Sequence, residues 1–209
     1  MPTSKSSLIH LSEISKKKVE SLFEKALMIK KNNHQKQNHV MSEFQGCTAA
    51  LLFFESSTRT RFSFEMAAAR AGIHPLVLSG GAGTSLEKGE TVFDTIKNIE
   101  AMRPDLFIIR CAGTTDLQKI SEAIAVPVIN AGWGLKGHPT QALLDAVTMF
   151  ERWNTLENKK VLFVGDALHS RVVASHFELA KKLNYQIDGR LIHQLKKQFQ
   201  IFQSFLHVI

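Results

Sequence analysis

A short segment rich in hydroxyl and guanidinium groups carries the first residues that could do chemistry. It contains Ser57, Thr58, Arg59 and Thr60, between an apolar, strand-like run and a helical pattern. The first turn of a helix leaves backbone N–H groups unpaired and carries the positive end of the helix dipole. Together with hydroxyl groups and an arginine, these N–H groups can surround a phosphate. The simpler interpretation is that Ser57 or Thr58 caps the helix while the arginines face solvent.

A second set of polar side chains follows further along the chain. His138 and Gln141 stand at the opening of another helical pattern, and Arg110 ends an apolar run. Taken singly, His138 is more typical of a surface or hydrogen-bonded core histidine, and Gln141 of an exposed helix residue. Ligands of open parallel sheets bind beyond the carboxyl ends of the strands, which is where all three residues are predicted. Their common position favours a ligand site.

The elements that must position these residues alternate regularly. Strand-like apolar runs are predicted at residues 49–54, 75–78, 106–110 and 126–130, and helices at 60–71, 91–102, 116–125 and 140–153. An amphipathic N-terminal helix precedes them and is followed by a polar break at 31–38. Such alternation predicts an α/β fold, with a parallel sheet flanked by helices on both faces.

A second unit begins after the last of these helices. A strand is expected at 161–164 and a helix at 171–183. We therefore expect a complete domain at 1–153, the start of a second α/β domain at 154–187, and a divergent tail at 188–209. The tail is basic and places apolar residues at helical spacing. These are Leu191, Leu195, Phe199, Phe202 and Leu206.

Composition narrows the class of protein. The chain has 209 residues, of which 44% are hydrophobic, and no apolar run approaches the ~18 residues of a membrane span. Residues 1–10 lack a secretory signal, so a cytoplasmic location is expected. The net charge of +7 could suit nucleic acid, but no aromatic interleaving accompanies it. Histidine spacing indicates no metal site, and Cys47 and Cys111 are expected to be reduced core thiols; no cofactor is expected.

The two polar segments resemble motifs of one enzyme family. Residues 57–61 resemble the Ser-Thr-Arg-Thr-Arg signature of the carbamoyltransferases, and residues 138–141 resemble the His-Pro-Thr-Gln motif that follows it. Residues 84–91 resemble the Ser…Lys-Gly-Glu loop of the aspartate branch. Residues 165–172 resemble the Gly-Asp-x-x-His-Ser-Arg segment that begins its aspartate domain. The likeness extends from Ser7 to about residue 187.

The resemblance implies transfer of a carbamoyl group from carbamoyl phosphate to L-aspartate, a step of pyrimidine synthesis. Residues 57–60 would bind the phosphate, and Thr60, Arg110 and His138 would donate hydrogen bonds to the carbonyl oxygen as it gains charge. Gln141 would orient the carbamoyl amide, and Arg171 would bind a carboxylate of aspartate. In a homotrimer, Ser85 and Lys88 would reach the site of the neighbouring subunit. The first domain would be the carbamoyl-phosphate-binding domain, and 154–187 part of the aspartate-binding domain.

Beyond residue 188 the likeness ends, and further segments that complete the family's aspartate site are not found. Weak activity or none is therefore expected of the chain alone. Three alternatives remain: a carbamoyl-phosphate-binding or assembly protein without turnover, a non-functional remnant, and an ornithine carbamoyltransferase. The tail could be the product of a frameshift, or a substitute helix that covers the first domain.

Overall fold

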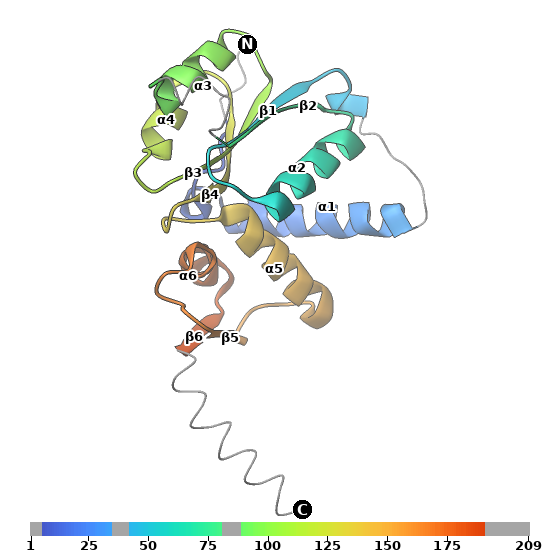
Figure 1. Cartoon of the computed structure of the whole chain (residues 1–209). Coiled ribbons are helices and arrows are strands. Elements are labelled where there is room, and N and C mark those ends of the chain that lie inside the picture. Colours follow the sequence, from blue (N-terminus) through green and yellow to red (C-terminus); the bar gives the residue numbers. More distant parts are fainter. Residues whose placement is uncertain (1–5, 35–41, 81–88, 191–209) are drawn as a thin grey trace, which may run out of the picture.

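The computed structural model describes residues 6–34, 42–80 and 89–190, and its centre is a four-stranded parallel sheet (Figure 1). Its strands are β1 (Thr48–Phe53), β2 (His74–Ser79), β3 (Leu106–Cys111) and β4 (Val128–Trp133), in the order β2-β1-β3-β4. Helices connect successive strands, because parallel strands need a crossover connection. The predicted α/β fold with a helix-flanked parallel sheet is confirmed.

Six α-helices surround the strands in the described residues. They are α1 (Lys16–His34), α2 (Thr58–Ala71), α3 (Val92–Glu100), α4 (Leu117–Ala123), α5 (Pro139–Trp153) and α6 (Arg171–Leu183). Two short 3-10 turns, η1 (Leu11–Glu13) and η2 (Ser42–Phe44), flank α1. No helix of the described part is both long and apolar enough to cross a membrane.

The central strands are covered on both faces, and alternate residues serve different cores. Ala50 and Leu52 of β1 pack in a cluster with residues of α3 and α4, whereas Leu51 and Phe53 pack in a second cluster that includes Phe64 of α2. This division follows from the two-residue period of a strand. Burial on both faces explains why these strands are continuous apolar runs in the sequence.

A smaller unit lies beyond α5 and contains β5 (Lys160–Val164), α6 and β6 (Gln186–Arg190), with the two strands parallel (Figure 1). A third cluster joins it to the first domain through Leu11, Phe23 of α1, Ala146 of α5 and Leu179 of α6. The second unit is thus attached by a shared apolar layer of helices.

Three element boundaries differ from the sequence-based expectation. α1 continues to His34, so the polar break does not begin at residue 31; a run of lysine and asparagine does not by itself end a helix. β4 is displaced to 128–133, because Pro127 has no N–H for the ladder. β6 continues through Arg190 by backbone pairing with β5, so the boundary drawn at 188 falls inside a strand. Residues 191–209 of the tail lie outside the described residues.

Candidate active site

The carboxyl ends of three parallel strands meet at one edge of the sheet. Phe53, the last residue of β1, is in register with Arg110 of β3, so the segment after β1 starts beside Arg110. β4 ends at Trp133, and the loop that follows leads to His138. A cavity of about 720 Å³ lies there. Its lining residues are Ser57, Arg59, Thr60, Ser63, Phe64, Ala67, Arg110, His138, Thr140, Gln141, Leu144 and Val172.

The N-terminus of α2 opens onto this cavity. Ser57 is the N-cap residue in an extended conformation, yet its side chain makes no capping hydrogen bond. The simple interpretation of Ser57 as a helix cap is therefore not realised, and its hydroxyl group remains available where the helix dipole favours an anion. Arg61 of the same segment lies 3.2 Å from Glu65 and does not line the cavity.

Arg110 and Arg171 converge on one carboxylate. Glu55 Oε2 lies 3.1 Å from Arg171 Nη1 and 3.7 Å from Arg110 Nε. Gly132 lies between the guanidinium groups, since a Cβ atom there would be 3.1 Å from Nη1 of each arginine. Burial and the charge of Arg171 lower the pKa of Arg110, while Glu55 opposes the shift. Two cations close together make this edge of the sheet attractive to anions.

His138 is held neutral beside these arginines. It is the N-cap residue of α5, and Pro139 follows at the first helical position, where proline is favoured. Burial, reinforced by Arg110 and Arg171, lowers the pKa of His138 to about 4. Its Nδ1 lies 3.3 Å from the Thr140 hydroxyl. Near neutral pH the ring can therefore donate one hydrogen bond without carrying charge.

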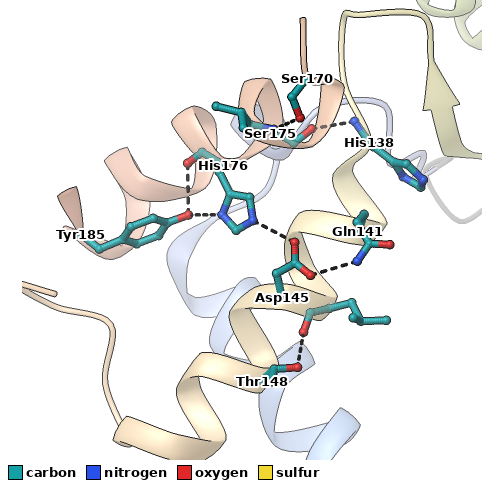
Figure 2. A network of polar contacts seen from close by, with 10 residues as sticks. His138, Gln141, Asp145, Thr148, Ser170, Ser175, His176 and Tyr185 are labelled. Carbon is teal, nitrogen blue, oxygen red and sulfur yellow. Dashed lines mark hydrogen bonds and ion pairs between the residues drawn. The ribbon is translucent and has the colours of Figure 1, made fainter. Parts of the chain in front are cut away.

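Contacts from α5 and α6 fix the residues on this side of the cavity. Gln141 Nε2 donates to Asp145 Oδ1 at 2.9 Å. The backbone N–H of His138 donates to Ser175 Oγ of α6 at 2.8 Å, as Figure 2 shows. The second unit thus supports the helix start that carries His138 and Gln141.

Comparison with known proteins decides the family. The family model described as aspartate/ornithine carbamoyltransferase, carbamoyl-P binding domain, matches residues 6–151. The chain belongs to the aspartate/ornithine carbamoyltransferase family. The aspartate carbamoyltransferase catalytic subunit of Prosthecochloris aestuarii is 43% identical over 169 residues, which are 81% of this chain and 54% of that protein. The catalytic subunit of Campylobacter hominis is 40% identical over 187 residues, 90% of this chain and 60% of the relative.

Solved carbamoyltransferase structures share the fold. Aspartate transcarbamoylase from Trypanosoma cruzi, in complex with carbamoyl aspartate and phosphate, gives a TM-score of 0.79 at 28% identity, over 88% of this chain and 58% of that one. Ornithine carbamoyltransferase from Pyrococcus furiosus also gives 0.79, at 29% identity, over 91% and 59%. The chain spans less than two-thirds of the length of these four relatives.

Most of the predicted site residues of this carbamoyltransferase-family chain meet at the cavity. Ser57, Arg59, Thr60, Arg110, His138 and Gln141 line it. Arg171 does not line it but lies at the same edge, against Glu55 and Gly132, whereas Thr58 is exposed and is not among the lining residues. Ser85 and Lys88 lie outside the described residues. Cys111 is buried, but Cys47 is only half-buried, so it is not the core thiol that was expected.

Sequence reasoning missed several residues that shape the site. Glu55 lies two residues before Ser57, the start of the segment expected to bind phosphate, and a carboxylate close to arginines in the sequence was a signal for an ion pair. Asp145 follows Gln141 at the i+4 spacing of a helix face, which was also a usable signal. His176 and Tyr185 gave none, because their link to Asp145 depends on how α6 packs against α5.

The described residues include no cluster of three or more His, Cys, Asp or Glu side chains that could hold a metal ion.

Proposed function

We propose that the cavity binds carbamoyl phosphate and that the chain serves transfer of the carbamoyl group to L-aspartate, giving N-carbamoyl-L-aspartate and phosphate. The observation that carries this proposal is the convergence of an uncapped helix N-terminus, Arg110, neutral His138 and Gln141 on one cavity. The aspartate branch is favoured by the relatives, which are named aspartate carbamoyltransferase catalytic subunits.

The phosphate group belongs at the start of α2. Its charge suits the helix N-terminus, where the Ser57 hydroxyl makes no cap, and Arg59 and Thr60 line the same cavity. Thr58 can contribute its backbone N–H even though its side chain is exposed, because the first N–H groups of a helix are unpaired. In this arrangement residues 57–60 hold the dianion without a metal ion.

The carbonyl oxygen of the carbamoyl group belongs between Thr60, Arg110 and His138. Negative charge develops on this oxygen when an amine attacks the carbonyl carbon. A neutral imidazole N–H, a hydroxyl group and a guanidinium group are all donors, and each well-placed donor is typically worth roughly 3–4 kcal/mol at the transition state. The lowered pKa of His138 keeps its ring in the neutral form at neutral pH.

The reaction needs no nucleophilic side chain. The aspartate amine forms a bond to the carbonyl carbon, the bond from that carbon to the phosphate oxygen breaks, and the departing phosphate accepts a proton from the amine. Holding the two reactants in contact provides a large part of the rate. Gln141 would orient the carbamoyl amide, and Arg171 would pair with a carboxylate of aspartate, exchanging its present partner Glu55.

The remaining expectations belong to the same proposal. Residues 1–153 would form the carbamoyl-phosphate-binding domain and 154–187 part of the aspartate-binding domain. In a cytoplasmic homotrimer, Ser85 and Lys88 of each chain would complete the phosphate site of the next. The family resemblance of residues 84–91 supports this arrangement.

A second candidate is a carbamoyl-phosphate-binding protein without turnover. The specific observation that favours it is the engagement of Arg171, the proposed aspartate-binding arginine, by Glu55 at 3.1 Å. One arginine cannot bind both carboxylates of aspartate in a bidentate manner. Aspartate-dependent release of phosphate distinguishes this candidate from the enzyme. An ornithine carbamoyltransferase would instead release phosphate with ornithine.

Calorimetric titration with carbamoyl phosphate tests the site, and phosphate release on addition of aspartate tests turnover. Arg110→Met should weaken carbamoyl phosphate binding by at least tenfold, because a charge-assisted hydrogen bond to an ionised ligand is worth roughly 1.5–3 kcal/mol. Arg152→Met, at the exposed end of α5, is the matched control and should bind like the wild type. Equal binding by Arg110→Met and wild type would overturn the assignment of the cavity.

A further inference from the structure

Four side chains form a continuous polar chain between α5, α6 and the residue before β6 (Figure 2). Gln141 Nε2 lies 2.9 Å from Asp145 Oδ1, and Asp145 Oδ2 lies 3.2 Å from His176 Nε2. His176 Nδ1 lies 2.7 Å from the Tyr185 hydroxyl, which is 3.1 Å from the backbone carbonyl oxygen of His176. This series of hydrogen-bonded side chains starts at the cavity with Gln141 and ends inside the second unit with Tyr185.

Only one assignment of donors and acceptors is possible for the hydrogen bonds that link Gln141, Asp145 and His176. An ionised carboxylate accepts hydrogen bonds and donates none. Burial alone would raise the pKa of Asp145, but hydrogen bonds from His176 and Gln141 lower it, so the group is ionised at neutral pH. His176 Nε2 must therefore carry a proton, and Gln141 must turn its NH₂ group toward Asp145.

The Tyr185 hydroxyl group fits this assignment whether the His176 ring is neutral or protonated on both nitrogens. If the ring is neutral, the hydroxyl group donates to Nδ1; if both ring nitrogens are protonated, the hydroxyl group donates to the carbonyl oxygen of His176. In both cases the proton on Nε2 faces Asp145. The amide oxygen of Gln141 consequently faces away from Asp145, and Gln141 is one of the residues that line the cavity.

We infer that Asp145, His176 and Tyr185 position Gln141 as a hydrogen-bond acceptor, so that the cavity selects an acyl phosphate bearing an N–H group over one bearing a methyl group. This inference rests on the proposed function and defines the substrate feature that Gln141 reads. Asp145, His176 and Tyr185 are positioning residues, because none of them lines the cavity. The preference for a ligand with an N–H group is thus set partly by residues of the second unit, although the phosphate and carbonyl groups of the ligand would be bound by the first domain.

The arrangement would be costly if it served packing alone. The side chains of His176 and Tyr185 are 1% and 5% exposed, so their polar atoms have exchanged water for one another. Apolar residues of similar size can fill such a space without that exchange. A purely structural role would affect stability and all ligands alike, whereas a positioning role changes the preference between ligands.

Calorimetry with inorganic phosphate, acetyl phosphate and carbamoyl phosphate separates these roles. In Asp145→Asn, the new amide can donate to Gln141 and release the fixed orientation. We expect phosphate affinity within threefold of wild type, and about a tenfold loss of the preference for carbamoyl over acetyl phosphate, the effect of one hydrogen bond. His176→Phe should lose less, and Tyr185→Phe about threefold. Asp116→Asn, an exchange of equivalent N-cap residues at the start of α4, where the Asp116 side chain is 45% exposed, should keep the wild-type preference.

The outcomes distinguish this inference from the proposed function. A folded Asp145→Asn protein with the wild-type preference would overturn the inference and leave the proposed function intact, as would a wild type that binds both acyl phosphates equally. A wild-type protein that binds neither inorganic phosphate nor carbamoyl phosphate would overturn both this inference and the proposed function. If Asp145→Asn does not fold, the same comparison is made with Tyr185→Phe, which deletes one oxygen atom; an unchanged preference there also overturns the inference.

Discussion

The two α/β regions of the chain differ in how their strands are covered. β1 and β3 of the first region are buried along almost their whole length, with helices on both faces. β5 of the second region alternates between exposed and half-buried residues, and its apolar residues Leu162 and Val164 are 47% and 61% exposed. The sheet that carries the site residues of the first region is therefore covered on both faces, whereas the two-stranded sheet of the second region is covered on one face only.

The second region reaches the site through polar contacts from a single helix. Five residues of α6 make polar contacts with the first region, namely Arg171 with Glu55, Ser175 with the His138 backbone, His176 with Asp145, Glu178 with the Leu11 backbone, and Lys182 with the Ser12 carbonyl oxygen. Residues 171, 175 and 178 follow the spacing of one helix face. The comparison teaches that core packing places the phosphate and carbonyl groups of the site, whereas the second region, which packs on α1 and α5 through an apolar layer, contacts the site residues by directional hydrogen bonds.

The largest expected effect is a loss in the free energy of unfolding that differs between the two regions. Phe107→Ala, in the fully buried core of β3, should lower the free energy of unfolding by about 3–5 kcal/mol, because it removes apolar contacts and leaves a cavity. Val164→Ala on exposed β5 should change it by no more than ~0.5 kcal/mol. Chemical denaturation measures both. Comparable losses in the two variants would show that β5 is covered in solution and remove the contrast.

The first region was predictable because its signals are local. Its strands are buried on both faces and appear as uninterrupted apolar runs, and Ser57 and His138 stand at helix starts that the sequence marks. Boundaries were harder, because β4 and β6 end where backbone pairing with a neighbouring strand ends, not where the apolar pattern does. Pairing between distant segments leaves no local trace.

The polar attachments of the second region were not predictable for a related reason. The motif residues Arg110, His138 and Gln141 were found because each lies at the end of a strand or the start of a helix. Glu55 lies outside the two sequence motifs, and His176 is one of many residues in the helical pattern at 171–183. The role of His176 arises only when α6 packs on α5, and the pairing of Glu55 with Arg171 only when α6 lies beside the end of β1, so no periodicity within either segment could have revealed these partners.

The second prediction uses the neutral histidine of the site. The folded pKa of His138, about 4, lies below the unfolded value of 6.5, so between these values the unfolded chain binds more protons and stability rises with pH. Lowering the pH from 6.5 to 4 should remove about 2–3 kcal/mol of stability through this residue. His138→Asn, which places a favoured residue type at the N-cap position of α5, should lose that much less over the same range. Glu178 and His10 titrate in both proteins and cancel in the difference between their denaturation curves, whereas Asp145 is coupled to His138, whose charge helps to lower its pKa, and its contribution is part of the measured difference. Parallel pH profiles would contradict the buried, neutral His138.

The third prediction breaks one attachment between the regions. Ser175→Ala removes the acceptor of the buried His138 N–H and should destabilise the chain by about 1–3 kcal/mol, the cost of an unsatisfied buried donor. Thermal unfolding measures the loss, and Ser79→Ala on exposed β2 provides a matched control within ~0.5 kcal/mol of wild type. A Ser175→Ala protein as stable as the control would mean that another group accepts from His138.

The smallest expected effect tests the carboxylate that both regions share. Glu55→Gln removes a negative charge 3.1 Å from Arg171 and 3.7 Å from Arg110. A partly exposed ion pair is worth roughly 0.2–1 kcal/mol, so carbamoyl phosphate should bind up to about fivefold more tightly as Arg110 loses a competing anion. Because Glu55→Gln also weakens the contact with Arg171 at the start of α6, hydrogen exchange of α6 amides should quicken while that of β3 stays unchanged.

A matched charge removal distinguishes local competition from a change in net charge. Glu151→Gln breaks the exposed 2.6 Å pair with Lys30 between α5 and α1, away from the cavity's arginines. It removes the same charge and should leave carbamoyl phosphate affinity and α6 exchange at their wild-type values. If Glu55→Gln instead weakened binding, Glu55 would be a residue that orients Arg110 for its ligand, and the attachment of the second region would be part of phosphate binding itself.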